Sequence, residues 1–376
     1  MHMEDDPFRA ESRAWLQAHL GDEPPAPREW ERRLGEGGWI GLGWPEPGYG
    51  NRTATLAQQI VWAEEYARSR APARLGHIGE NLLGPTLIAH GSPEQKARFL
   101  GPVARGEEIW CQGYSEPGAG SDLAGVATAA VRDGDGYRVT GQKIWTSFAH
   151  EANWCFALVR TDPGTTRHHG LSFLLIPMDQ PGLIEVRPIR QMTGTSEFNE
   201  VFFDGARALA AHLVGGEGNG WRVAMSLLAL ERGVSTLVQQ IGFAEELAEV
   251  VRTAVASGAA GDPVLRDRLV RQWAELRTMR WNALRTLGGG GDTGAPSVAK
   301  LLWAGWHQRL GELAMAVRGP VAATGPYDWS EHRPYELDPV QRMFLFSRAD
   351  TIYGGSDEIQ REIIAERVLG LSREPR

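Results

Sequence analysis

Residues 110–122, WCQGYSEPGAGSD, and residues 136–147, GYRVTGQKIWTS, decide how the rest of the chain is interpreted. The first stretch mixes glycine and proline with serine and acidic residues, which suits a backbone held close to a ligand with its N–H groups free to donate. Strands are expected over Thr128–Arg132, Tyr137–Thr140 and Gln142–Ser147, with turns at residues 133–136 and at Gly141. These residues alone fit either a ligand site or a surface loop followed by a β-meander.

Length and composition place the chain among globular proteins. Its 376 residues suit two or three domains with sizeable cores, and a formal net charge of −8 argues against nonspecific binding to nucleic acid. Cys111 and Cys155 are the only cysteines, so we expect neither a disulfide framework nor a cysteine-based metal site. No apolar run approaches the roughly 20 residues of a membrane span, and the first residues lack a signal-peptide pattern. We therefore expect a cytoplasmic protein.

Helical patterns flank a central region of strands. Before residue 110, apolar spacing predicts helices over Pro7–Leu20, Glu29–Glu36, Ala54–Arg70, Ile78–His90 and Pro93–Val103. In the central region, strands are expected over Cys155–Arg160, Leu171–Pro177, Ile184–Ile189 and Glu200–Asp204. So many short strands favour a small barrel or sandwich. Beyond residue 220, helices are expected over residues 221–257, 263–287, 297–317, 339–350 and 357–369.

Several conspicuous features are interpreted as structural. His168 and His169 lack a third ligand at a useful spacing, so a solvated loop is favoured over a metal site. The glycine run at 288–294 lacks the Gly-Lys-Ser/Thr ending of a phosphate-binding loop, which favours a flexible connector. Four tryptophans are better interpreted as core or interface residues than as parts of a cofactor site: Trp273, Trp281, Trp303 and Trp306.

In content and spacing, the two opening stretches resemble the flavin-binding middle segment of the acyl-CoA dehydrogenase family. The resemblance covers nearly the whole chain and implies a multidomain α+β fold. Its expected parts are an N-terminal helical domain (1–109), a middle β-barrel domain (110–216) and a C-terminal four-helix bundle (217–376). It also implies FAD as cofactor, bound by Gln112, Tyr114, Ser115, Ser121, Trp145, Thr146, Ser147, Ser356 and Glu358. Hydroxyl groups can hydrogen-bond the ring edge and phosphates, while an indole can cover an aromatic face.

The catalytic base departs from the usual family pattern. Residues 352–361, IYGGSDEIQR, are similar to the signature Tyr-Glu-Gly-Thr-x-Glu/Gln-Ile-Gln-Arg, whose glutamate commonly serves as base, but that position is Gly354. Isovaleryl-type and long-chain members place their base on a bundle helix immediately before an arginine, which here would be Glu231 before Arg232. A helical wheel puts Glu231 at the margin of an apolar stripe, where partial desolvation raises the pKa of a carboxyl group and makes it a better base.

The resemblance implies FAD-dependent α,β-dehydrogenation of an acyl-CoA thioester to the 2-enoyl-CoA. Glu231 would remove the α-proton, Arg232 would bind substrate, and the backbone N–H of Gly354 would donate to the thioester carbonyl. The β-hydrogen would pass as hydride to N5 of the flavin, and the electrons would continue to an electron-transferring flavoprotein.

Two further departures concern the assembly. Homomeric members cover the adenine half of the flavin with Arg-x-x-Phe-Gly and Gln-x-x-Gly-Gly motifs of a neighbouring subunit. The corresponding stretches here, Ser257–Gly261 (SGAAG) and Ala316–Pro320 (AVRGP), lack the expected side chains. This pattern resembles heteromeric members, including bacterial steroid side-chain dehydrogenases. We therefore expect a tetramer that includes a second, related subunit.

Three other functions stay open on the sequence. A flavin monooxygenase could use the same fold, although such relatives usually lack the ending found after Gly354. A nitroalkane-oxidase-like activity is disfavoured because it also needs an acid at that position. A non-catalytic accessory subunit of a heteromeric acyl-CoA dehydrogenase would bind a catalytic partner without turning over substrate.

Overall fold

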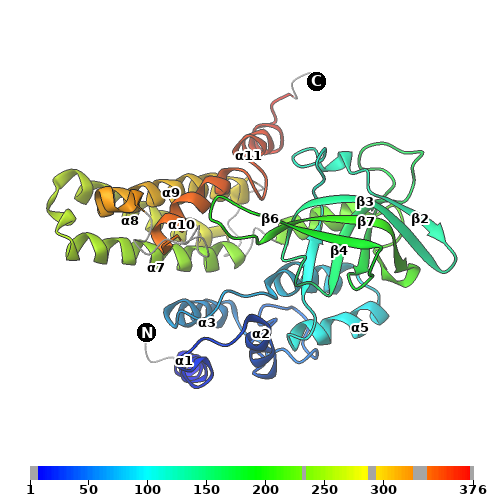
Figure 1. Cartoon of the computed structure of the whole chain (residues 1–376), viewed down its shortest axis with the longest axis horizontal. Coiled ribbons are helices and arrows are strands. Elements are labelled where there is room, and N and C mark those ends of the chain that lie inside the picture. The colour runs from blue at the N-terminus through cyan, green and yellow to red at the C-terminus, as the bar shows by residue number, and fades with distance from the viewer. Residues whose placement is uncertain (1–6, 231–233, 287–293, 325–336, 373–376) are drawn as a thin grey trace. The chain divides into compact units, whose positions relative to one another are not determined.

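A computed structural model of the chain describes residues 7–230, 234–286, 294–324 and 337–372 (Figure 1). The chain divides into two compact units. The first is Met1–Ile189 with Ser196–Glu231, and the second is Arg190–Thr195 with Arg232–Arg376. The domain boundaries expected after residues 109 and 216 stay a prediction. The predicted glycine connector lies almost entirely outside the described residues.

Helices cover the beginning and the end of the first unit. They are α1 (Pro7–Leu20), α2 (Pro27–Glu36), α3 (Leu56–Arg68), α4 (Gly84–His90), α5 (Pro93–Ala104) and α6 (Gly220–Leu230). Side-chain caps begin two of them: Thr55 accepts from the N–H of Gln58, and Ser92 accepts from the N–H of Gln95. In both, the glutamine side chain bonds back, which satisfies two end groups at once. The helix expected over 78–90 begins as a π-helical turn, Gly79–Leu83.

The remainder of the first unit is an eight-stranded sheet. Its strands are β1 (Trp110–Gly113), β2 (Ala129–Asp133), β3 (Gly136–Ser147), β4 (Trp154–Arg160), β5 (Leu171–Pro177), β6 (Ile184–Ile189), β7 (Phe198–Leu209) and β8 (Leu213–Val214). They follow the order β6-β7-β3-β2-β4-β5-β8, and β1 pairs with β4 in parallel. The long strand β3 therefore lies between β7 and β2, in the interior of the sheet.

The turn predicted at Gly141 is wrong. Strand β3 continues through this residue, which pairs with Phe203 of β7. Glycine is needed for another reason: its φ is +154°, and a Cβ there would lie 2.5 Å from Oγ1 of Thr128. The pattern also missed β1 and β8, because neither a four-residue buried run nor a two-residue strand shows a clear alternation.

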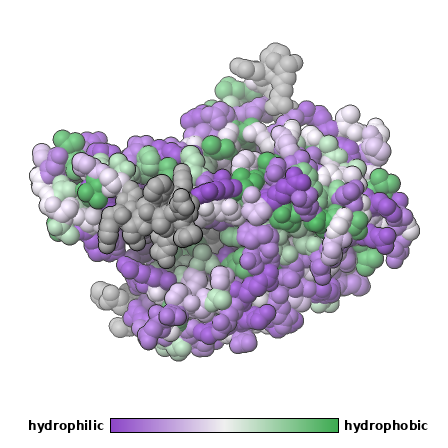
Figure 2. Space-filling model, viewed as in Figure 1, coloured by the Kyte–Doolittle hydropathy of each residue, from purple (hydrophilic) through white to green (hydrophobic). Residues whose placement is uncertain are grey.

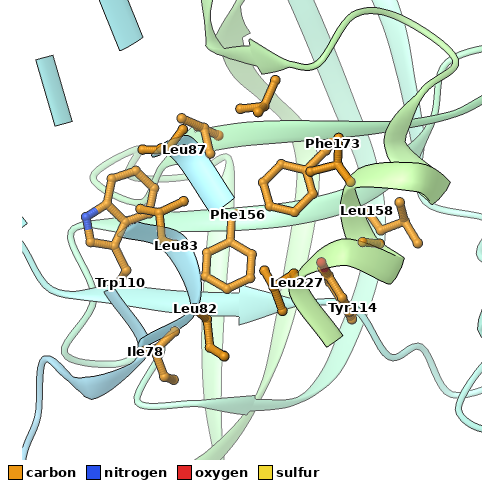
Figure 3. Close-up of a cluster of buried hydrophobic side chains, with 14 of the residues drawn as sticks. Ile78, Leu82, Leu83, Leu87, Trp110, Tyr114, Phe156, Leu158, Phe173 and Leu227 are labelled. Atoms are coloured by element: carbon orange, nitrogen blue, oxygen red, sulfur yellow. The ribbon is translucent and has the colours of Figure 1, made fainter. Parts of the chain in front are cut away.

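Side chains from both helices and strands meet in one core of the first unit (Figure 3). The rings of Phe156 and Phe173, from the neighbouring strands β4 and β5, stack with their centroids 5.5 Å apart. Leu83, Trp110 and Leu227 bring the π-helical turn, β1 and α6 to the same cluster. Each large apolar side chain buried in this way stabilises the fold by about 1.5–3 kcal/mol. The cluster thus fixes β1, from which the first diagnostic loop begins.

The second unit is helical. Its helices are α7 (Val234–Ala256), α8 (Pro263–Arg285), α9 (Ala295–Arg318), α10 (Pro339–Phe346) and α11 (Asp357–Ile363). Helix α9 packs against α7, α8 and α10, and it also contacts a 3-10 turn, η7 (Ser347–Thr351). The helices expected over 339–350 and 357–369 thus end as a 3-10 turn and a π-helical turn, respectively.

Trp273, Trp281, Trp303 and Trp306 divide into two kinds. Trp303 and Trp306 on α9 are buried in the bundle core, whereas Trp273 and Trp281 on α8 are 54% and 67% exposed.

On the face shown in Figure 2, hydrophobic patches interrupt a largely hydrophilic surface. In the part of the chain that the structure describes, no helix combines the length and the apolar character needed to cross a bilayer.

Candidate active site

A buried ion pair joins the two diagnostic stretches. The ammonium group of Lys143, from the middle of β3, donates to Oε1 of Glu116 at 2.8 Å, and the lysine side chain is fully buried. The same ammonium donates to the carbonyl oxygens of Tyr114 and Leu158. The Glu116 carboxylate also accepts from the backbone N–H groups of residues 127–128. The loop after β1 is therefore fastened to the sheet at both of its ends.

Electrostatics act on both partners of this pair. Burial raises the pKa of Glu116, but the charge of Lys143 and several hydrogen bonds outweigh burial and lower that pKa below its usual value. Burial lowers the pKa of Lys143, and Glu116 offsets part of this effect. Buried charges are tolerated when their remaining hydrogen-bonding positions are filled, and each member of this pair has several partners.

The loop held by this pair presents the predicted phosphate-side residues. Gln112 and Ser115 are half-buried, whereas Ser121 is exposed. Among the described residues, a Cβ at Gly118 or Gly120 would have no neighbouring atom within 4 Å. The segment therefore combines open glycine backbone with serine hydroxyl groups, which is the kind of surface that can approach an anion closely.

Trp145 lies at the end of β3 in an unusual conformation. Its φ is +59°, which is uncommon for a residue with a side chain, and the residue is 55% exposed. The pairing of β3 with β7 changes register between Lys143 and Thr146, and such irregularities re-aim side chains. Oγ1 of Thr146 is buried without a hydrogen-bond partner among the described residues, and Ser147 beside it is half-buried. Strained backbone and an unsatisfied hydroxyl together are typical of a ligand site.

These residues fit a flavin. The exposed indole of Trp145 can cover one face of the ring system, and the hydroxyl of Thr146 can bond to its polar edge. The serine- and glycine-containing loop suits a pyrophosphate. Tyr114 is placed differently from the others: it is 6% exposed, and its ring packs edge-on against Phe156 and Phe173. Its side chain therefore belongs to the core at the base of the loop.

The second diagnostic stretch forms a tight turn in the second unit. Gly354 and Gly355 have φ values of +64° and +86°, which side chains rarely adopt. The amide group of the buried Gln360 donates to both of their carbonyl oxygens, at 3.3 and 3.2 Å. Ser356 caps the start of α11, and Glu358 lies exposed in the first turn of this helix.

Gly354 presents its backbone N–H to solvent. The residue is exposed, and within the described ranges this N–H donates to no acceptor. A Cβ at position 354 would meet the side chain of Lys300, whose Nζ would be 3.9 Å away. The turn thus offers a hydrogen-bond donor and no group that can take up a proton. Glu231 and Arg232, the predicted base and substrate-binding residue, lie outside the described residues.

A charged cluster that no sequence pattern indicates lies next to this turn. His307 of α9 contacts Asp350 through Nδ1 at 2.5 Å and Glu246 of α7 through Nε2 at 2.9 Å. The hydroxyl of Tyr353 donates to the other carboxylate oxygen of Asp350 at 2.6 Å. The sequence shows Asp350 three residues before Tyr353, but His307 is 43 residues away from Asp350 in the chain. No local pattern could have joined them.

The fold and the arrangement of these residues are those expected of a flavoprotein oxidoreductase. More narrowly, the chain matches three domains of the acyl-CoA dehydrogenases: the N-terminal domain over residues 4–107, the middle domain over 111–206 and the C-terminal domain over 218–369. The chain belongs to the acyl-CoA dehydrogenase family, which uses FAD. It therefore has the expected α+β fold of that family, with helical, β and helical parts.

Similar proteins include acyl-CoA dehydrogenase IpdE1 of Mycobacterium tuberculosis, which is 53% identical over 385 residues that cover 98% of each chain. Among solved structures, the steroid ACAD Tcur3481-Tcur3483 has a TM-score of 0.86 at 28% identity and covers 98% of this chain and 97% of its own. The ChsE4-ChsE5 complex from Mycobacterium tuberculosis has a TM-score of 0.81 at 30% identity, with complete coverage of both chains.

Proposed function

We propose that this chain catalyses the FAD-dependent α,β-dehydrogenation of an acyl-CoA thioester, with Glu231 as the base. The observation that carries the proposal is the turn at Gly354, which offers a solvent-facing N–H and cannot accept a proton. A donor aimed at the thioester carbonyl stabilises the negative charge that develops there as the α-proton leaves. The acceptor of that proton must then lie elsewhere in the chain.

Glu231 is the proposed acceptor of the α-proton, and Arg232 beside it the proposed contact to the acyl-CoA. The loop after β1 and the end of β3 would hold FAD, with Ser356 and Glu358 as further contacts. Bound there, FAD would accept the β-hydrogen as hydride, which no side chain can do. The product would be a 2-enoyl-CoA, and an electron-transferring flavoprotein would be the electron acceptor.

Glu231→Gln tests the base. The amide keeps the size of the side chain but cannot take up the α-proton, so we expect retained flavin and a loss of substrate-dependent flavin bleaching of roughly 10²- to 10⁴-fold. Bleaching is measured anaerobically after adding a panel of acyl-CoA thioesters. The matched control is Glu245→Gln on α7, an exposed glutamate outside the proposed site. Wild-type bleaching rates in Glu231→Gln would refute the assignment.

Anaerobic bleaching also separates the alternatives. A dehydrogenase bleaches its flavin without oxygen, whereas a monooxygenase of the same fold would not oxidise the thioester under these conditions. An accessory subunit would bind a partner without any bleaching of its own.

We also propose that the active assembly contains a second, related subunit. The two stretches that would cover the adenine half of FAD are helix ends here: Gly258 has φ +79° after α7, and Gly319 has φ +64° after α9. Arg318, within the second stretch, is engaged by Asp338. Two of the structural neighbours are two-component proteins by their titles, which is consistent with this assembly.

The exposed face of α8 supports a partner of this kind. At about 100° per residue, four of its exposed apolar positions fall within a stripe roughly 80° wide: Val270, Trp273, Trp281 and Leu284, whereas Val264 in the first turn lies outside it. Arg277 lies on the same stripe, with its guanidinium 5.2 Å from the centroid of the Trp273 ring. Exposed tryptophan and arginine side chains are enriched at protein interfaces. We propose the second acyl-CoA dehydrogenase-like subunit as the occupant of this face.

A further inference from the structure

Tyr353, the residue directly before Gly354, is held in place by a buried carboxylate of the bundle. The hydroxyl of Tyr353 donates to Oδ1 of Asp350, whose side chain is 1% exposed. Gly354 is the next residue along the chain. The N–H of Gly354 lies in the planar peptide group that it shares with the carbonyl of Tyr353, so a shift of Tyr353 redirects this N–H.

Asp350 is in turn fixed by two cations from α9. Its second carboxylate oxygen, Oδ2, accepts from Nδ1 of His307, and its backbone carbonyl accepts from Nζ of Lys300. The Lys300 ammonium also lies over the ring of Tyr353, 4.6 Å from the centroid. Every polar atom of the Asp350 side chain is thus engaged, and both Asp350 and Tyr353 are tied to one long helix.

His307 needs its charge to make these contacts. A neutral imidazole has one N–H, but His307 faces a carboxylate at each nitrogen: Asp350 from η7 and Glu246 from α7. Lys300 of α9 and the phenol of Tyr353 face the other side of Asp350. Burial alone would lower the pKa of His307, but the hydrogen bonds and charges of Asp350 and Glu246 raise it to about 9. The ring is therefore an imidazolium at neutral pH.

We propose that His307 and Asp350 are positioning residues for catalysis: acting through Tyr353, they hold the Gly354 N–H in the orientation that receives the thioester carbonyl. Neither residue touches substrate in this scheme. The inference rests on the proposed function, because it assigns the Gly354 N–H to the thioester. It goes further in naming what makes a glycine turn rigid enough to serve as an oxyanion donor, since such donors act only when their geometry is fixed beforehand.

Tyr353→Phe is the mildest test, because it removes a single hydroxyl from a residue that is 38% exposed. We expect a folded protein with a modest loss of stability, because Oδ1 of the buried Asp350 loses its donor. KM should stay within about twofold, and kcat should fall by about 5- to 10-fold because the Gly354 N–H is held less firmly. Asp350→Asn should lower kcat further, by roughly 10- to 100-fold. The control is Glu275→Gln, which breaks an exposed pair with Arg309 on the same bundle.

Two more measurements exclude a merely structural role. In the wild type, kcat should fall with an apparent pKa near 9 as His307 loses its proton, and this limb should disappear in His307→Gln. Amide hydrogen exchange of the peptide containing residues 353–356 should be faster in Asp350→Asn and Tyr353→Phe but unchanged in Glu275→Gln. The exchange measurement needs no substrate and no turnover.

The outcomes separate this inference from the proposed function. Wild-type kcat in both Tyr353→Phe and Asp350→Asn, or a limb near pH 9 that persists in His307→Gln, would overturn the positioning role. Wild-type bleaching in Glu231→Gln would instead overturn the base while leaving the Tyr353 and His307 results to stand.

Discussion

Lys143 shows how one side chain can organise a ligand loop. It is fully buried in β3, and its three hydrogen-bonding directions reach Glu116 and the carbonyl oxygens of Tyr114 and Leu158. Glu116 in turn takes up two backbone N–H groups at the far end of the loop. This buried ion pair therefore sets the positions of the predicted flavin-contact residues, such as Ser115 beside Glu116.

We predict that Lys143→Met strongly destabilises the first unit. The substitution leaves the Glu116 carboxylate buried without its cation, and removing one partner of a buried pair typically costs about 3–5 kcal/mol. Chemical denaturation followed by tryptophan fluorescence measures this loss. Flavin content after purification should fall in parallel, because the loop loses its anchor.

The double variant Lys143→Met with Glu116→Gln is the matched control. Since it removes both charges, it should be more stable than Lys143→Met alone, as a double-mutant cycle requires for coupled residues. Arg138→Met, on the same strand as Lys143, removes an exposed pair with Asp133 of β2 and should change stability little. The single variant Glu116→Gln completes the cycle, and a loss in the double variant equal to the sum of the two single losses would contradict the coupling.

At the scale of elements, α9 joins the bundle core to the glycine turn. One stretch of this helix buries Trp303 and Trp306 in the core and places Lys300 and His307 against η7. The helix is therefore both the centre of the hydrophobic packing and the support of the charged cluster. Stability of the bundle and geometry of the turn should respond together to the state of His307.

We predict that His307 makes the stability of the bundle depend on pH. Its folded-state pKa of about 9 lies above the usual 6.5, so its contribution is fully present below pH 6.5 and is lost as the pH rises through about 9. This difference corresponds to on the order of 3 kcal/mol. The free energy of unfolding should therefore fall between pH 6.5 and 9.5 in the wild type and much less in His307→Gln. An exposed histidine, His168→Gln, serves as control and should keep the wild-type dependence.

At the scale of the whole molecule, the proposed assembly would complete the proposed flavin site. The loop proposed to hold flavin is fastened to the sheet, but the Ser257–Gly261 and Ala316–Pro320 stretches lack the side chains that the family resemblance leads us to expect over adenine. An apolar stripe on α8 remains exposed. Both observations are accounted for by one additional subunit.

We predict that the chain purified alone binds flavin below one equivalent and that co-expression with its related subunit restores full occupancy. Trp281→Glu should prevent co-purification, because it replaces the most exposed ring of the apolar α8 stripe with a charge. Light scattering and flavin absorbance measure the two effects. Val131→Glu, at an exposed valine of β2, is the control and should assemble normally. Stoichiometric flavin and activity in the isolated chain would contradict the heteromeric assembly.

Helices and strands follow from local sequence in this chain. The capped start at Ser92, the strands over Leu171–Pro177 and Ile184–Ile189, and the glycine turn at Gly354 are all visible in short windows. Periodicity and turn residues act over a few positions, so these features could be predicted. Gly141 shows the limit: the residue signals a turn, but Thr128 packing against it and pairing with β7 keep the strand continuous.

The sequence by itself determined the family and most of the elements, because these depend on motifs and on spacing along the chain. The flavin contacts of the loop after β1 stay a prediction. Tertiary structure alone decided which charges meet. Lys143 pairs with Glu116, and His307 pairs with Asp350 and Glu246, across separations of 27, 43 and 61 residues. Coulomb and hydrogen-bond energies depend on distance in space, and residues so far apart acquire that distance only when the chain has folded.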